Sequence, residues 1–246
     1  MSVSWLNPAG GLRYHVRAYS SRRLWAPFTS AVGAWLLKFQ PRVKRAVFVG
    51  PSAAYSFPDA FLRQFSEISV LEPDPIARWL LLRRLRGLGI SVPRVEAGDL
   101  LLRPLISGGG GLAELLAAEP DLTLIFGNLL GQTRFLLSEA DFECFKAGFR
   151  ERLRPLLLSR SWLSLHDRFS GNLRPSFTGS FLSGSRLSDA KVLSDLYASE
   201  RLGAVVELFD HQSGGFFPSQ LPHAYFSWQI DSARHHLVEA VFAEPR

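Results

Sequence analysis

The sequence of 246 residues contains almost no cysteine and no long hydrophobic run. Cys144 is the single cysteine, which excludes an intrachain disulfide framework and a zinc site built from cysteines. Apolar runs such as residues 79–82 are far shorter than the roughly 20 residues that span a bilayer. The first residues also lack the apolar core of a signal peptide. We therefore expect a cytoplasmic protein with no transmembrane segment.

Acidic residues are missing from the first 58 positions, although basic residues are frequent there. The basic residues are Arg13, Arg17, Arg22, Arg23, Lys38, Arg42, Lys44 and Arg45. The charge of this region is +8, whereas the net charge of the whole chain is +6. The excess of positive charge therefore lies in the N-terminal region. Such a region suits an anionic partner: nucleic acid, a lipid surface or an acidic substrate. The simpler interpretation is a solvated helical face, because the basic residues alternate with apolar and aromatic ones.

Strands and helices alternate along the middle of the chain. Strands are predicted over residues 45–50, 68–72, 92–97, 122–126 and 162–166, where short apolar runs are bounded by turn residues. Helices are predicted over residues 59–65, 76–88, 112–118 and 138–153. This alternation is typical of βαβ units, and therefore of an α/β fold with a mostly parallel sheet.

The two ends of the chain follow other patterns. Residues 1–41 predict a helical extension, with one helix over 12–19 and a second that has Pro27 in its first turn and ends near Phe39. Residues 168–187 are rich in Ser, Gly and Arg and predict an exposed loop, followed by a helix over 189–202. Apolar runs at 204–209, 224–230 and 237–242 predict strands, the last two as a hairpin. We expect one domain: extension 1–41, core 42–167, insertion or lid 168–220 and hairpin 221–246.

Ligands of open α/β sheets bind outside the carboxyl ends of the strands, so the residues after each strand are the candidates. The first strand leads into Gly50, Pro51, Ser52 and Tyr55. Glycine and small residues let a ligand come close to the backbone there. The second strand leads into Glu72, with Asp74 as a second candidate. An acid about 20 positions after a glycine turn is where a ribose hydroxyl pair is held.

The next two strands also lead into glycine-containing turns with a polar side chain. The third is followed by Gly98, Asp99 and Leu100, and the fourth by Gly127, Asn128 and Leu129. A carboxylate after the third strand can accept a hydrogen bond from an adenine amino group. Each turn alone is ordinary loop chemistry, but four such turns in order indicate a nucleotide-like pocket.

This series of turns resembles the core of the class I S-adenosylmethionine-dependent methyltransferases, over residues 42–167 and 221–246. The resemblance implies a Rossmann-like fold with helices on both faces, and S-adenosylmethionine as the cofactor. It implies that residues 50–52 lie against the methionine part and that Glu72 holds the ribose. It also implies that Asp99 and Leu100 border the adenine and that residues 127–129 lie near the sulfonium. The hairpin at the end of the chain is similar to the last two strands of that family.

The sequence departs from this family in its first and fourth turns. Gly50 is the only glycine of the first turn, and Pro51 removes a backbone donor. The fourth turn is not of the Asn-Pro-Pro-Tyr type, so methylation of an amide or base nitrogen is not supported. Two hypotheses therefore remain. One is an active methyltransferase whose methyl acceptor is unknown. The other is a catalytically degenerate relative that binds or scaffolds, with RNA as a partner of its basic region.

Methyl transfer needs a general base only where the acceptor carries a proton. The candidates are His166 and Asp167 at the end of the fifth predicted strand, and His211 in a loop before two glycines. The other interpretation of each histidine is a structural hydrogen bond. The loop 210–218 is either a substrate lid or a turn anchored by two phenylalanines. Residues 235–236 are two histidines with no third ligand nearby, so no metal site is predicted.

Overall fold

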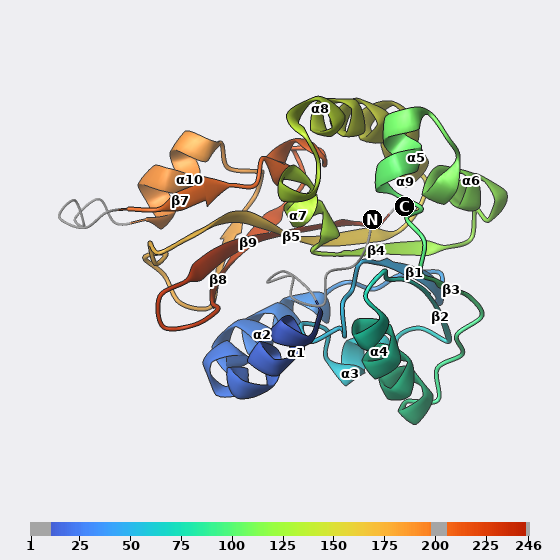
Figure 1. Cartoon of the computed structure of the whole chain (residues 1–246), viewed down its shortest axis with the longest axis horizontal. Helices are drawn as coiled ribbons and strands as arrows, with labels where there is room; N and C mark the ends of the chain where they lie inside the picture. Colours follow the sequence, from blue (N-terminus) through green and yellow to red (C-terminus); the bar gives the residue numbers. More distant parts are fainter. Residues whose placement is uncertain (1–10, 198–205, 245–246) are drawn as a thin grey trace.

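The computed structural model describes residues 11–197 and 206–244. A central sheet separates two layers of helices (Figure 1). No helix within these ranges is long and apolar enough to cross a membrane. The strands are β1 (Arg45–Val49), β2 (Glu67–Leu71), β3 (Val95–Glu96), β4 (Thr123–Gly127), β5 (Trp162–Gly171), β6 (Ser180–Ser183), β7 (Leu208–Asp210), β8 (His223–Gln229) and β9 (His235–Ala243).

The strand order in the sheet is β3-β2-β1-β4-β5-β9-β8-β6. The first five of these strands are mutually parallel, as the alternation of strands and helices predicts. β9 then pairs antiparallel with both β5 and β8, and β6 adds to β8 at the edge. β7 pairs antiparallel with the far end of β5, beyond the point where β4 stops. The predicted fold class is therefore confirmed.

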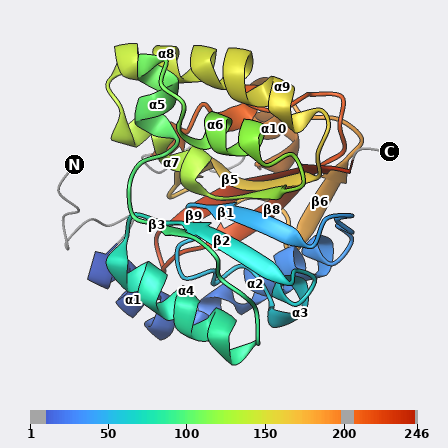
Figure 2. The same cartoon turned by 90° about the vertical axis from the view of Figure 1, so that its right-hand side faces the viewer.

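One face of the sheet is covered by the N-terminal half of the chain. It carries α1 (Gly11–Ser20), α2 (Arg22–Leu36), α3 (Asp59–Leu62) and α4 (Pro75–Gly87), which lie below the sheet in Figure 1 and in Figure 2. Their apolar residues pack with one face of β1, β2, β5, β8 and β9 into a single cluster rich in aromatic side chains. Fully buried Phe39, Phe48 and Phe61 lie at its centre.

The other face carries the middle of the chain. Its helices are α5 (Leu102–Ser107), α6 (Gly111–Ala118), α7 (Leu129–Leu136), α8 (Glu139–Gly148), the π-helical turn η1 (Phe149–Leu153) and α9 (Arg154–Leu157). They pack with the opposite face of β1, β4 and β5 around Phe126, Phe145 and Phe149. A smaller third cluster joins α10 (Asp189–Leu196) to the antiparallel strands through Tyr225 and Leu237.

Several predicted elements differ from the structure. Pro27 lies inside α2 rather than in its first turn, because that helix begins at Arg22, and the helix ends at Leu36 rather than near Phe39. α5 and α7 were not predicted, and the helix predicted over 138–153 changes to π-helical geometry after Gly148. The third strand is only two residues long.

The largest error concerns residues 168–187, for which an exposed loop was predicted. The first four residues continue β5 to Gly171, and residues 180–183 form β6. The boundary predicted between core and insertion therefore falls inside a strand. The predicted helix 189–202 ends at Leu196, and residues 198–205 lie outside the described part of the chain.

Candidate functional site

The carboxyl ends of β1, β2 and β4 lie at one edge of the sheet. Register places Val49 opposite Leu71 and Phe126, so the next residue of each strand reaches the same edge. These residues are Gly50, Glu72 and the turn at Gly127 and Asn128. Three of the four turns named from the sequence therefore lie at one edge of the sheet, the edge where ligands of such sheets bind.

The turn after β1 has an unusual backbone. Gly50, Ser52 and Ala54 all have positive φ, at 59°, 51° and 57°. Only glycine takes this conformation without strain, so Ser52 and Ala54 store conformational energy in one short loop. Asn128, in the turn after β4, also has a positive φ of 69°. Strain of this kind concentrates at functional sites, and here it gathers at the predicted pocket edge.

The turns after β1 and β4 pack directly against each other. A Cβ atom on Gly50 would lie 2.5 Å from the Cβ of Leu129, and one on Gly127 would lie 2.6 Å from the Cα of Pro51. Neither position accepts a larger residue without moving the facing turn. Both glycines therefore have a packing role whether or not a ligand binds beside them.

Glu72 points back into the turn after β1. Its carboxylate accepts hydrogen bonds from the backbone N–H of Ser52 at 2.7 Å and of Asp74 at 2.9 Å. The residue is only 6% exposed. Burial raises the pKa of Glu72 to about 7, although the two backbone donors oppose this shift. A buried carboxyl with so high a pKa at a strand end is typical of a functional site.

Helix α1 closes over the neighbourhood of Glu72. Asp74 accepts a hydrogen bond from the Gly11 N–H at 2.7 Å and lies 3.3 Å from His15 Nε2. The other ring nitrogen of His15 lies 2.8 Å from the Tyr55 hydroxyl. Asp74 also caps α4, through the N–H groups of residues 76 and 77. Asp74 and Tyr55 thus anchor α1, and this role was not foreseen.

Asp99 has a different role from the predicted one. Its exposed carboxylate accepts hydrogen bonds from the backbone N–H groups of Leu101, Leu102 and Arg103, at 3.0, 2.7 and 2.9 Å. It therefore satisfies the free donors at the start of α5. Gly98 has open space around it, and Leu100 is half-buried.

Asn128 joins the turn after β4 to Asp167 in β5. Its side-chain oxygen accepts from the Asp167 N–H at 2.7 Å, and its amide nitrogen donates to the Asp167 carboxylate at 3.0 Å. The Gln132 amide donates to the same carboxylate oxygen at 2.9 Å. On the other side, His236 Nδ1 of β9 lies 3.0 Å from this oxygen.

The Asp167–His236 pair is arranged like the acid and base of a catalytic dyad. Asp167 is completely buried, while the His236 side chain keeps 19% of its surface exposed. Burial alone would raise the pKa of Asp167, but the His236 imidazole and the Asn128 amide lower it to about 2. The two side chains are in ion-pair contact, although His236 Nδ1 makes no well-aligned hydrogen bond. His236 is the candidate that the sequence analysis missed.

His166 does not work with Asp167 as expected. β5 continues past both residues, and neighbours in a strand point to opposite faces of the sheet. His166 is 1% exposed, its Nδ1 lies 2.9 Å from the Ser164 hydroxyl, and its Nε2 lies 3.8 Å from Glu239. It therefore belongs to a buried charged cluster with Glu239.

His211 is also held inside the protein. One ring nitrogen contacts the Gly131 carbonyl and the other lies 2.8 Å from the Ser170 hydroxyl. Burial lowers the pKa of His211. The loop that follows is a turn anchored by Phe216 and Phe217, which pack among the aromatic residues of the upper layer. In the structure the two phenylalanines at residues 216–217 therefore anchor this turn.

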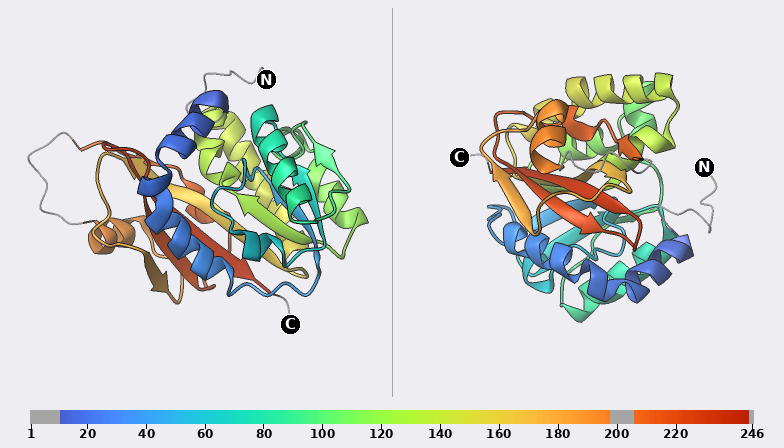
Figure 3. Two further views of the ribbon diagram at one scale, coloured as in Figure 1. Left: turned by 90° about the horizontal axis from the view of Figure 1, so that it is seen from below. Right: turned by 90° about the vertical axis from the view of Figure 1, so that its left-hand side faces the viewer.

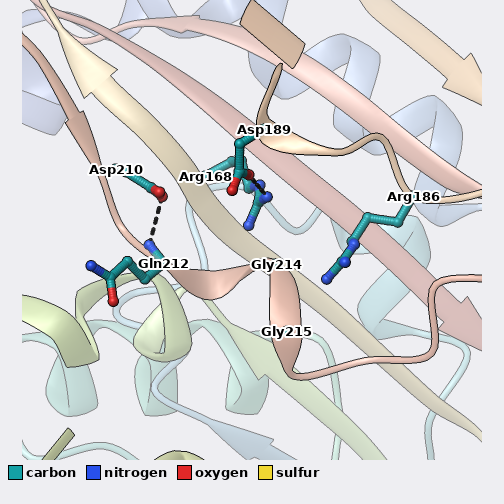
Figure 4. A pocket seen from close by; sticks show the side chains of 7 residues that line it. All are labelled: Arg168, Arg186, Asp189, Asp210, Gln212, Gly214 and Gly215. Atoms are coloured by element: carbon teal, nitrogen blue, oxygen red, sulfur yellow. Dashed lines mark hydrogen bonds and ion pairs between the residues drawn. The ribbon is translucent and has the colours of Figure 1, made fainter. Parts of the chain in front are cut away.

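A polar hollow of about 320 Å³ opens beside this turn. Its lining residues are Arg168, Arg186, Asp189, Asp210, Gln212, Gly214 and Gly215 (Figure 4). Arg168 contacts the Asp189 carboxylate, and the Asp210 carboxylate accepts from the Gln212 N–H at 2.7 Å. Two arginines and two aspartates give the hollow no net charge. Within residues 11–197 and 206–244, no group of three or more His, Cys, Asp or Glu is placed to hold a metal ion.

The family of folds follows from the topology. Five parallel strands in the order 3-2-1-4-5 are the doubly wound arrangement. The last strand, β9, is inserted antiparallel between β5 and β8. The sheet therefore has the Rossmann-like, doubly wound topology, extended by antiparallel strands.

No protein-family model matches the chain, and no curated protein matches it in sequence. Solved methyltransferases are among the structures to which the chain is similar. One from Leishmania major is 12% identical, with a TM-score of 0.46, 98% of this chain and 87% of that chain covered. One from Clostridium acetobutylicum is 9% identical, with a TM-score of 0.42, and the match covers 94% of this chain and 99% of that chain. The magnesium protoporphyrin IX methyltransferase of Synechocystis, solved with bound S-adenosylmethionine, is 10% identical, with a TM-score of 0.41, 96% and 88% covered.

Proposed function

We propose that this protein binds S-adenosylmethionine and transfers its methyl group to an acceptor that carries a proton. The observation that carries the proposal is Glu72: a buried carboxylate directly after β2, aimed at the strained turn after β1. It stands at the edge of the sheet where this fold binds a nucleoside.

The donor set fits the ribose and methionine parts of the cofactor. A carboxylate offers about four acceptor positions. Backbone N–H groups take two of those on Glu72, and the others suit two ribose hydroxyls. The turn at Gly50, Pro51 and Ser52 offers a close backbone approach for the methionine part. At the adenine end the Asp99 carboxylate is already engaged, so Gly98 and Leu100 would border the ring.

Bound S-adenosylmethionine supplies an electrophilic methyl group. Asn128 and Leu129 would line the cofactor, and Asn128 connects that turn to Asp167. Asp167 holds His236 through Nδ1, so that His236 Nε2 takes the acceptor proton as the methyl group arrives. This assigns Asp167 as the orienting acid and His236 as the general base, in place of His166 and His211.

Calorimetric titration with S-adenosylmethionine and with its demethylated product tests the cofactor site. We expect both to bind, and Glu72→Ala to weaken binding by at least about tenfold, since a hydrogen bond to a charged group contributes about 1.5–3 kcal/mol. Glu67→Ala is the matched control, because Glu67 is an exposed acid at the other end of the same strand. Absence of heat from the wild-type protein with either ligand would refute the proposal.

The acceptor can be sought with radiolabelled S-adenosylmethionine and cell extract, separated into protein, RNA, lipid and small-molecule fractions. We expect the wild-type protein to label one fraction. His236→Gln is expected to lower the rate by about 100-fold or more while its cofactor affinity stays unchanged. Equal labelling by the variant would remove His236 from the mechanism and leave the cofactor site standing.

The alternative is a relative of the enzymes that has lost the cofactor and acts as a binding or scaffold protein. Two contacts favour it: Leu129 packs against Gly50, and α1 is anchored on Asp74 and Tyr55. The same titration decides between the two, because the scaffold needs no S-adenosylmethionine. We also infer a cytoplasmic location, which the single, exposed and unpaired Cys144 supports.

A further inference from the structure

The face of the molecule formed by α1, α2 and α4 contains no acidic residue in any of these helices. The three helices cover the same side of the sheet, as the view from below shows (Figure 3, left). Their sequences contain arginines at the surface, and Asp74, which precedes α4, is buried. These three helices therefore expose only basic charge, and the exposed Asp59 of neighbouring α3 pairs with Arg84 of α4.

Helix α1 adds an exposed apolar stripe to this charge. Leu12, Val16 and Tyr19 are 54%, 58% and 73% exposed. Their spacing of four and three residues places them on one side of the helix. The helix buries a different side, with Gly11, His15 and Ala18. α1 thus has a buried face, an exposed apolar stripe and, next to it, Arg13 and Arg17.

Further arginines lie beside exposed aromatic rings. The Arg22 guanidinium stacks on the Tyr19 ring at 4.7 Å, and Arg83 lies 5.8 Å from the ring of Trp79, which is 59% exposed on α4. α1 and α4 contact each other on this side of the sheet. Among the described residues, no ion pair neutralises Arg13, Arg17, Arg22, Arg23, Arg83 or Arg86.

We propose that this surface docks onto an anionic lipid bilayer, with the stripe of α1 inserted between the headgroups. An amphipathic helix with arginines beside its apolar face binds the membrane interface in this way. The arginines meet lipid phosphates, and interfacial aromatic residues such as Tyr19 and Trp79 suit the headgroup level.

The charges and the aliphatic side chains of this surface favour a bilayer over the other partners. A second copy of the chain would bring two positive surfaces together, which is unfavourable. RNA would satisfy the arginines, but Leu12 and Val16 have no ring on which a base can stack, and they would stay exposed to water. A bilayer offers both negative charge and apolar volume. The proposal does not depend on methyl transfer.

Sedimentation with vesicles tests the docking of this surface onto a membrane. The vesicles consist of phosphatidylcholine alone or of phosphatidylcholine mixed with phosphatidylglycerol, at physiological ionic strength. We expect binding to the mixed vesicles only. Arg13→Gln/Arg17→Gln is expected to weaken it by about 25-fold, since each arginine near an anionic surface contributes about fivefold. Leu12→Ser/Val16→Ser is expected to lower it by more than about tenfold.

Two double variants elsewhere on the surface serve as matched controls. Leu158→Ser/Leu182→Ser removes two exposed leucines, and Arg103→Gln/Arg150→Gln removes two arginines from the opposite layer of helices. Both are expected to bind like the wild-type protein, and circular dichroism verifies that every variant is folded. Absence of binding to mixed vesicles, equal losses in the controls, or binding to RNA with none to vesicles would each overturn the proposal.

Discussion

At the scale of single residues, Glu72 makes a prediction about stability and pH. Its folded-state pKa of about 7 lies above its ordinary value of 4.5, so the folded protein binds more protons between these values. The free energy of unfolding should therefore carry a component that falls as pH rises from about 4.5 to about 7.

Urea unfolding across this pH range, with wild-type protein and Glu72→Gln, measures that component. The variant should lose it whatever its overall stability, because glutamine does not titrate. Identical slopes for the two proteins would show that Glu72 is not a buried, titrating acid. If S-adenosylmethionine binds, its affinity should also rise with pH through about 7, as the carboxylate ionises.

At the scale of elements, α8 shows a predicted helix start that the structure confirms. Ser138 has extended backbone angles, and its hydroxyl accepts from the Asp141 N–H at 3.2 Å. Ser138→Ala should lower the free energy of unfolding by about 1 kcal/mol, because a helix donor loses its acceptor.

Denaturant titration measures the effect on α8, and Ser30→Ala provides the comparison. Ser30 is exposed inside α2, where alanine is the better helix former, so this variant should be neutral or slightly stabilising. A loss for Ser30→Ala as large as that for Ser138→Ala would contradict the capping explanation.

At the scale of the whole molecule, Glu239 ties three strands together. It is fully buried in β9, 2.6 Å from His223 Nδ1 of β8 and 3.3 Å from Arg168 Nε of β5. Burial would raise its pKa, but the histidines and Arg168 hold the pKa well below its usual range. Glu239→Gln removes the only buried carboxylate that contacts Arg168, whose other partner is the exposed Asp189, and should cost about 3–5 kcal/mol.

Asp189→Asn is the matched comparison, because Asp189 contacts the same arginine but is 55% exposed. Its loss should be about 1 kcal/mol or less, since solvent screens an exposed pair. The two values come from urea unfolding at neutral pH. Because the pKa of Glu239 is lowered, its stabilising contribution is present at neutral pH and is lost as pH falls into the acid range. Equal losses for the two variants would contradict this view of the cluster.

The strands at the centre of the sheet were predicted within one or two residues. β1, β2 and β4 are short apolar runs between breakers, and parallel strands buried on both faces have that pattern. Residues 168–171 of β5 were predicted as part of a loop. They belong to a strand because β9 and β7 pair with residues 169–171 on either side.

The sequence by itself determined the alternation of strands and helices, the glycine turn after β1 and the acid after β2. Each of these depends on residues close together in the chain. Only the tertiary structure decided which side chains meet: Asp167 with His236, His166 with Glu239, and α1 with Asp74. A side chain's face depends on strand register, and register depends on pairing between distant segments.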